Sequence, residues 1–107
     1  MDYGNRADGT KKGKGYFGEV ARPDGSVSTE ISVGVGINGK QTEIPLMVPT
    51  LNKAELDYLI NTPVKSKGFM SNMPKSIIEK AYDHAVMRIQ DGKSPFAGPD
   101  EVGALPE

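Results

Sequence analysis

The sequence contains no cysteine and a single histidine, His84. Without cysteine the chain can form neither disulfide bonds nor thiolate zinc sites, and it has no thiol nucleophile. With only one histidine, most catalytic arrangements built around an imidazole are also excluded. Acidic residues never cluster at the spacing of a metal site. We therefore expect a protein that is not an enzyme and that binds no metal and no cofactor.

Two further absences bear on the partners of the chain. The sequence has 13 basic and 14 acidic residues, and a net charge of −1 creates no global field that would attract nucleic acid or an anionic membrane surface. No apolar stretch approaches the roughly 20 residues that a membrane span needs, and the amino-terminal residues lack the apolar core of a signal peptide. We expect synthesis in the cytoplasm, no membrane partner, and a partner other than nucleic acid.

Glycine and proline are abundant, at 13 and 8 of the 107 residues. The length is that of a single domain, which we expect at residues 15–93. Residues 1–14 are net basic and residues 94–107 are net acidic and rich in proline and glycine, and neither segment has apolar periodicity. Both are therefore expected to be flexible arms that gain order only on a partner.

Residues 16–48 carry the pattern of a three-stranded antiparallel meander. Apolar side chains and Thr29 recur at every second position from Val27 to Ile37, which is typical of a strand with one buried face. A Pro-Asp-Gly segment before this strand and an Asn-Gly pair after it are typical of hairpin turns. Pro45 cannot donate to a ladder, so the third strand is expected at an edge of the sheet.

Two helices are expected after the sheet. Asn52 with a glutamate three residues later forms a capping box, which predicts a helix over residues 53–61. Apolar residues at spacings of three and four after Pro74 predict a longer helix that ends at Gly92. Residues 64–72 have no period and are expected to be a loop. The fold expected is thus α+β, with the three-stranded meander packed on about two helices.

One motif suggests nucleotide chemistry, but its context argues against it. Residues 13–20 spell G-x-G-x-x-G-x-V, the glycine-rich loop of protein kinases. The segment runs into a turn where a strand with a lysine should follow, and the other kinase motifs are missing. The glycines also precede a strand, whereas a dinucleotide-binding fold needs them between a strand and a helix. We interpret them as part of a glycine-rich arm.

His84 is expected to be a surface histidine. It falls with Lys80 and Arg88 on one stripe of the second helix, away from the apolar stripe. A histidine between two cations is a poor general base, and no Gly-x-Ser-x-Gly motif accompanies it.

A series of turn and strand-edge segments is spread over residues 5–96. The segments include Asn5-Arg6-Ala7-Asp8-Gly9, Gly15-Tyr16-Phe17-Gly18, Arg22-Pro23-Asp24-Gly25, Glu43-Ile44-Pro45, Val48-Pro49-Thr50-Leu51 and Gly92-Lys93-Ser94-Pro95-Phe96. In this order they resemble a small domain of tailed-bacteriophage proteins, found free or embedded in large virion-associated and internal polypeptides. The resemblance implies a structural or virion-associated role and brings no catalytic residues with it.

The resemblance and the lack of catalytic chemistry together predict a non-enzymatic structural or adaptor protein. We expect it to be located in the virion and to be made in the host cytoplasm. We expect it to bind other phage virion proteins or copies of itself through its arms and a sheet edge. The alternative is a small inhibitor of a host defence protein. An accessory to an enzyme is the least favoured reading.

Five apolar side chains are expected at interfaces with partners: Tyr16, Phe17, Phe69, Met70 and Phe96. The first two lie on the first strand, residues 16–21, whose free edge is expected to accept a strand of another chain. The next two lie in the loop before the second helix, and the last lies in the carboxy-terminal arm. Met73, next to the start of the second helix, is expected to be buried instead.

Overall fold

A computed structural model gives the fold and describes residues 3–6 and 8–106. The elements follow in the order β1 (Val20–Ala21), β2 (Val27–Ser28), β3 (Ser32–Ile37), β4 (Lys40–Pro45), α1 (Lys53–Asn61), α2 (Gly68–Ser71) and α3 (Lys75–Gln90). The class is α+β, as the sequence predicts. The strands form two antiparallel sheets of two strands each, β1–β2 and β3–β4, so the prediction of one three-stranded meander is wrong.

The meander divides in two because its expected central strand is broken between β2 and β3. Thr29, Glu30 and Ile31 are all buried, whereas consecutive side chains of a strand point to opposite faces. Gly15 passes so close to this segment that a β-carbon on it would lie 1.9 Å from the carbonyl oxygen of Thr29. The close approach needs glycine at this position, and the bend turns Glu30 inward toward Arg6.

Both predicted hairpin turns are confirmed. The amide of Arg22 donates to the carbonyl of Ser26 at 2.8 Å and closes the β1–β2 turn. In the β3–β4 turn, Asn38 and Gly39 have φ angles of 52° and 79°. Two successive left-handed residues make a type I′ turn, whose twist matches that of the strands.

The long helices begin and end where the sequence predicts. The side chain of Asn52 accepts from the amide of Glu55, whose carboxylate accepts from the amide of Asn52, so the capping box of α1 is confirmed. Helix α3 begins directly after Pro74, and Gly92 follows its end with a φ of 76°. Helix α2 was not expected, because its four residues are too few to show a period.

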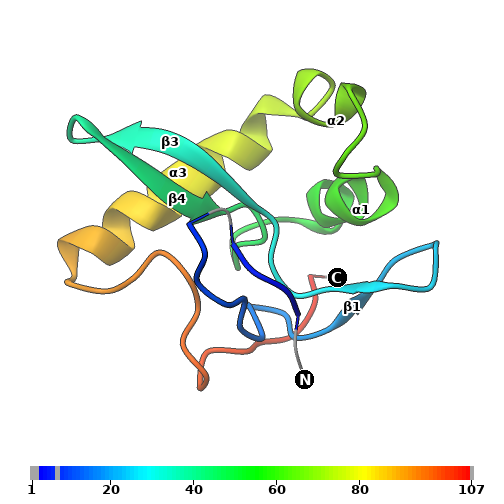
Figure 1. Ribbon diagram of the computed structural model, residues 1–107, viewed down its shortest axis with the longest axis horizontal. Helices are drawn as coiled ribbons and strands as arrows, with labels where there is room; N and C mark the ends of the chain where they lie inside the picture. The colour runs from blue at the N-terminus through cyan, green and yellow to red at the C-terminus, as the bar shows by residue number, and fades with distance from the viewer. Residues whose placement is uncertain (1–2, 7, 107) are drawn as a thin grey trace.

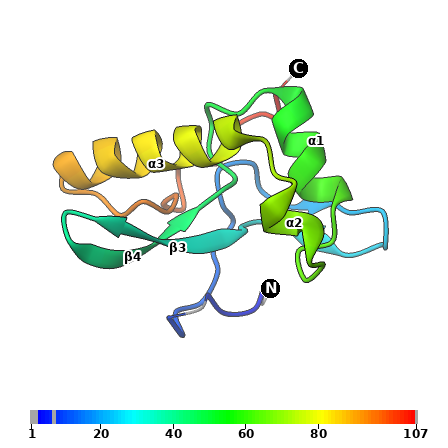
Figure 2. The same ribbon diagram turned by 90° about the horizontal axis from the view of Figure 1, so that it is seen from above.

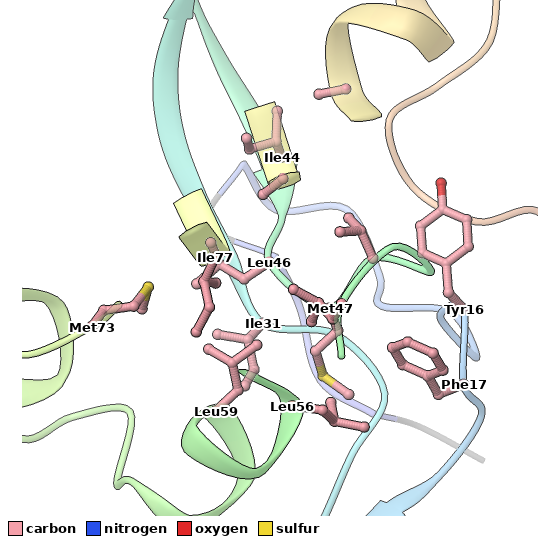
Figure 3. Close-up of a cluster of buried hydrophobic side chains, with 14 of the residues drawn as sticks. Tyr16, Phe17, Ile31, Ile44, Leu46, Met47, Leu56, Leu59, Met73 and Ile77 are labelled. Carbon is pink, nitrogen blue, oxygen red and sulfur yellow. The ribbon is translucent and has the colours of Figure 1, made fainter. Parts of the chain in front are cut away.

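Helix α3 lies over one face of the β3–β4 hairpin and makes its sheet contacts chiefly with β4 (Figure 2). Helices α1 and α2 stand together beside the end of the hairpin that is far from its turn (Figure 1). The core lies between these elements, and Figure 3 shows its side chains converging from the sheet, the helices and the segment after Gly15. Its fully buried members include Ile44, Leu46, Leu59 and Ile77.

The described residues of both arms pack on the rest of the molecule, which corrects the expectation that the arms are flexible. Asn5 pairs with Lys11 in an isolated β-bridge, so the amino-terminal arm folds back on itself. In the carboxy-terminal arm Phe96 is buried, and the amide of Gly103 donates to the carbonyl of Tyr16 at 2.7 Å. The expectation was based on the low apolar content of the two arms. It took no account of the ion pairs that hold both arms on the domain. The domain boundaries at residues 15 and 93 stay a prediction.

Candidate interaction surface

Strand β3 pairs with β4 along one edge only, and the register determines which backbone groups face outward. Ile37 pairs with Lys40 next to the two-residue turn, and this first pair exchanges both hydrogen bonds. Hydrogen-bonded and non-hydrogen-bonded pairs alternate along an antiparallel ladder. The N–H and C=O groups of Ser32, Gly34 and Gly36 therefore point away from β4.

These outward groups are unpaired in the part of the chain that the structure describes, since none of them has a hydrogen bond outside the ladder. Gly34 and Gly36 are exposed and have no side chain to shield the edge. A β-carbon on Gly36 would meet no atom within 4 Å, so the space beside it is open. Unpaired strand edges of this kind are templates for another strand.

The outer edge of β4 is blunted. Its outward positions are Gln41, Glu43 and Pro45, and the proline has no N–H to offer. Because Pro45 occupies an outward position, it costs the β3–β4 ladder no hydrogen bond. The Glu43 side chain turns away from this edge toward β3, where its carboxylate accepts a hydrogen bond from the Ser32 hydroxyl at 2.8 Å. Of the two edges, that of β3 is therefore the open one.

Of the five side chains expected at interfaces, Met70 alone is exposed, at 51%. The other four are at most 8% exposed and belong to the buried interior of the chain: Tyr16, Phe17, Phe69 and Phe96. The expectation of an exposed contact at Phe69 is wrong. Helix α2 turns the Phe69 ring inward, and its centroid lies 6.1 Å from that of the Tyr58 ring. Met73 is buried, as predicted.

The edge expected at residues 16–21 is absent, which corrects the position at which a partner strand was expected. Strand β1 has two residues, and neither Tyr16 nor Phe17 belongs to it. The Tyr16 hydroxyl donates to the carbonyl of Pro95 at 2.7 Å, and its own carbonyl accepts from Gly103. This segment is thus covered by the carboxy-terminal arm.

A partly buried ion pair joins the amino-terminal arm to the bend between β2 and β3. Nε and Nη2 of Arg6 each donate to one carboxylate oxygen of Glu30 at 2.7 Å, and the amide of Gly13 adds a third hydrogen bond at 2.9 Å. The hydrogen bond to Glu30 raises the pKa of Arg6 above its usual value. The guanidinium also lies 3.9 Å from the ring centroid of Phe96, so the pair connects both arms.

A second ion pair joins α3 to the carboxy-terminal arm. The guanidinium of Arg88 pairs with both carboxylate oxygens of Glu101 and donates to the carbonyls of Ser94 and Phe96 at 2.8 and 2.9 Å. The hydrogen bonds from Arg88 lower the pKa of Glu101 to about 2. Arg88 was expected on the exposed stripe of the helix, but the arm covers it and leaves it 6% exposed.

His84 is 9% exposed, so the expectation of a surface histidine is wrong. Its ring meets the Tyr16 ring edge to face, with 5.0 Å between centroids. Burial and then the charge of Arg88 lower the pKa of His84, which keeps the imidazole neutral at pH 7. Its Nε2 atom has no hydrogen-bond partner among the described residues. The geometry therefore gives this histidine a packing role.

The part of the chain that the structure describes holds no group of three or more His, Cys, Asp or Glu side chains able to bind a metal ion. None of the helices in that part has the length and apolar character needed to cross a membrane.

Comparison of the chain with protein-family models, with curated proteins and with solved structures finds no match. The open edge of β3 is thus identified by its geometry alone.

The glycines of β3 are the residues that sequence reasoning missed. Gly34 and Gly36 alternate with valines, and this alternation was interpreted as the solvent face of a central strand. Alternating glycines indicate an unshielded edge only in a strand that lies at the edge of its sheet. The bend at residues 29–31 puts β3 at an edge, because it separates β3 from the first hairpin.

Proposed function

We propose that this chain is a non-enzymatic structural or adaptor protein of a bacteriophage particle, and that it joins protein chains by accepting an extended strand at the edge of β3. The observation that carries the proposal is the row of unpaired backbone groups on Ser32, Gly34 and Gly36. Backbone hydrogen bonds supply the affinity in this mode of recognition, and the proposal needs no side-chain pocket.

The character of β3 supports strand addition. Its six residues carry no charge, and no proline interrupts them. Natural proteins protect edges with charge, proline or a covering segment. Strand β3 itself has neither charge nor proline, and the Glu43 carboxylate of β4 lies beside its Ser32 and Gly34. An edge left in this state is suited to binding another chain.

The assignment to a phage particle rests on the resemblance of the sequence segments between Asn5 and Phe96 to the small domain of virion-associated phage proteins. It is tested by mass spectrometry of purified particles from the phage that encodes the chain. We expect the chain in stoichiometric copies. Its absence from the particles would contradict the virion role and favour the inhibitor of a host protein.

The role of the edge is tested with two matched variants. Gly36→Pro removes an outward N–H from β3, and Gln41→Pro removes one from the opposite position on the outer edge of β4. Neither N–H takes part in the ladder, so the two substitutions disturb the hairpin alike. We expect particles to lose the Gly36→Pro chain and to retain the Gln41→Pro chain. Retention of both would contradict strand addition at β3.

A further inference from the structure

We infer that the strand that pairs with β3 is β3 of a second copy of this chain, antiparallel and related by a two-fold axis at Gly34. This inference rests on the proposed function, because it names the partner of the same edge. The result is a continuous four-stranded sheet in the order β4, β3, β3 of the second copy, β4 of the second copy. Closed two-fold dimers are the commonest soluble oligomers.

The backbone of β3 is self-complementary in this register. Its outward groups belong to Ser32, Gly34 and Gly36, and Gly34 lies in the middle. With Gly34 opposite its copy, Ser32 lies opposite Gly36, and every outward residue exchanges both of its hydrogen bonds with another. A slip of one residue would oppose outward groups to inward ones. A slip of two would bring the hairpin turn or the bend opposite the strand.

The side chains of β3 fit the same register. Val33 and Val35 pack against the core but remain partly exposed. The two-fold axis places Val33 opposite Val35 of the second copy, in a non-hydrogen-bonded pair whose α-carbons lie about 4.5 Å apart. Pairs of β-branched side chains across strands are stabilising, and the contact completes the burial of both valines. On the other face the glycines and Ser32 meet, with the Glu43 carboxylate of each copy beside them.

Helix position permits the dimer, and charge makes it sensitive to salt. Residues 32–39 carry no charged side chain. The nearest like charges are the two Glu43 carboxylates, each of which accepts from Ser32 of its own β3 and lies beside Gly34 near the axis. Salt screens their repulsion, so we expect the dimer to tighten as the ionic strength rises. Helix α3 makes its sheet contacts chiefly with β4, the strand farther from the axis.

Pairing between two β4 edges is the competing arrangement, and it is disfavoured. It would bring Pro45, which has no N–H, into the new ladder, and it would set the Gln41 and Glu43 side chains of two copies side by side. Pairing at the β3 edge should be sensitive to Gly36→Pro, whereas pairing at the β4 edge should be sensitive to Gln41→Pro.

The test is sedimentation equilibrium of the full chain from micromolar to millimolar concentration. We expect a monomer–dimer equilibrium for the wild type and for Gln41→Pro. For Gly36→Pro we expect the dissociation constant to rise by about 100-fold, because the axis removes the same hydrogen bond twice. A wild type that stays monomeric throughout, or a Gly36→Pro chain that dimerises as tightly, would overturn the inference.

Folding and register are checked separately. Melting followed by circular dichroism shows whether Gly36→Pro is folded, and Gly36→Glu replaces it if the proline unfolds the chain. The glutamate keeps the N–H and has open space for its side chain. In the dimer it would lie opposite Ser32 of the second copy, whose hydroxyl holds the Glu43 carboxylate, so the two like charges should weaken the dimer by tenfold or more, that is by about 1.4 kcal/mol. Dimerisation of Gly36→Glu as tight as that of the wild type would contradict the inference. In a mixture of labelled and unlabelled chains, we expect an intermolecular NOE between the α-protons of Val33 and Val35. A dimer that lacks this NOE would be paired through another surface or register, which would contradict the inference.

Failure of this inference and failure of the proposed function give different results. A monomeric wild type whose incorporation into particles still depends on Gly36 overturns self-pairing and leaves strand addition in place. A dimer that needs Gly36, with particles that accept the Gly36→Pro chain, supports self-pairing and contradicts the adaptor role of the edge.

Discussion

Buried polar side chains are the residues on which the arms depend. Glu30 and Arg88 are at most 6% exposed, and each is paired with a charged residue of an arm. Breaking such a pair leaves a buried charge without compensation, which is strongly destabilising. The Thr29 hydroxyl and the Nε2 atom of His84 are the buried groups without a partner among the described residues. Ion pairs thus attach the two arms at single positions, whereas the burial of apolar side chains holds the rest of the core together.

Phe69 and Met70 are adjacent residues with opposite environments, at 3% and 51% exposed. We expect Phe69→Ser to lower the free energy of unfolding by about 3–5 kcal/mol, because it empties a buried ring position. Met70→Ser is the matched control and should change that free energy by at most about 0.5 kcal/mol. Urea unfolding measures both. A small effect at Phe69 would mean that its ring is not part of the core.

Among the elements, helix α1 owes its start to local chemistry and its position to packing. The capping box at Asn52 fixes the first turn, and Leu56, Leu59 and Ile60 are buried against the core. The β3–β4 hairpin is different, since an isolated two-stranded hairpin is at best marginally stable in water. It is held by α3 and by the buried residues that follow β4. Its open edge is therefore part of a rigid element.

The cap of α1 gives a prediction at the scale of the element. Asn52→Ala removes the hydrogen bond from the amide of Glu55 and should lower the free energy of unfolding by about 1 kcal/mol. Asn61→Ala, at the exposed last residue of the same helix, is the control and should have a smaller effect. Thermal melting of the two variants tests this. Equal losses at both positions would show that the cap contributes nothing specific.

At the scale of the whole molecule, the arms close the structure around Tyr16. Burial raises the pKa of Tyr16 to about 12, and its ring meets His84 while its backbone and hydroxyl bind the carboxy-terminal arm. Arg88 and Glu101 hold the same arm on α3. Stability of the whole chain should consequently respond to the charge of these groups.

Acid should loosen this closure in two stages. The folded pKa of His84 is lowered by burial, so the unfolded chain takes up the proton first and stability falls as the pH drops below 6.5. The folded pKa of Glu101 is about 2 against an ordinary 4.5, so its contribution is complete above pH 4.5 and is lost toward pH 2. Urea unfolding at a series of pH values measures both stages.

Glu101→Gln is the control for the lower stage. The difference in unfolding free energy between wild type and variant should be largest above pH 4.5 and should shrink as the pH falls toward 2, because the wild-type carboxylate becomes protonated. A difference that stays constant over this range would show that the ion pair with Arg88 does not hold the arm in solution.

The sequence by itself determined the features that depend on neighbouring residues. The α+β class, the two hairpin turns, the capping box at Asn52 and the end of α3 before Gly92 all follow from side chains a few positions apart, whose preferences act wherever the chain folds. The burial of Met73 follows from its place next to the start of a helix.

Tertiary structure alone decided the rest. The break of the expected central strand depends on Gly15 approaching Thr29, and the attachment of the arms depends on Arg6 reaching Glu30, 24 residues away. The alternating pattern of Val27 to Ile37 fits a continuous strand as well as it fits a broken one. The open edge of β3 follows from that break, because a strand becomes an edge only through the absence of a neighbour. Local preferences carry no information about which distant segments come into contact. The surface proposed to bind a partner is a result of those tertiary contacts.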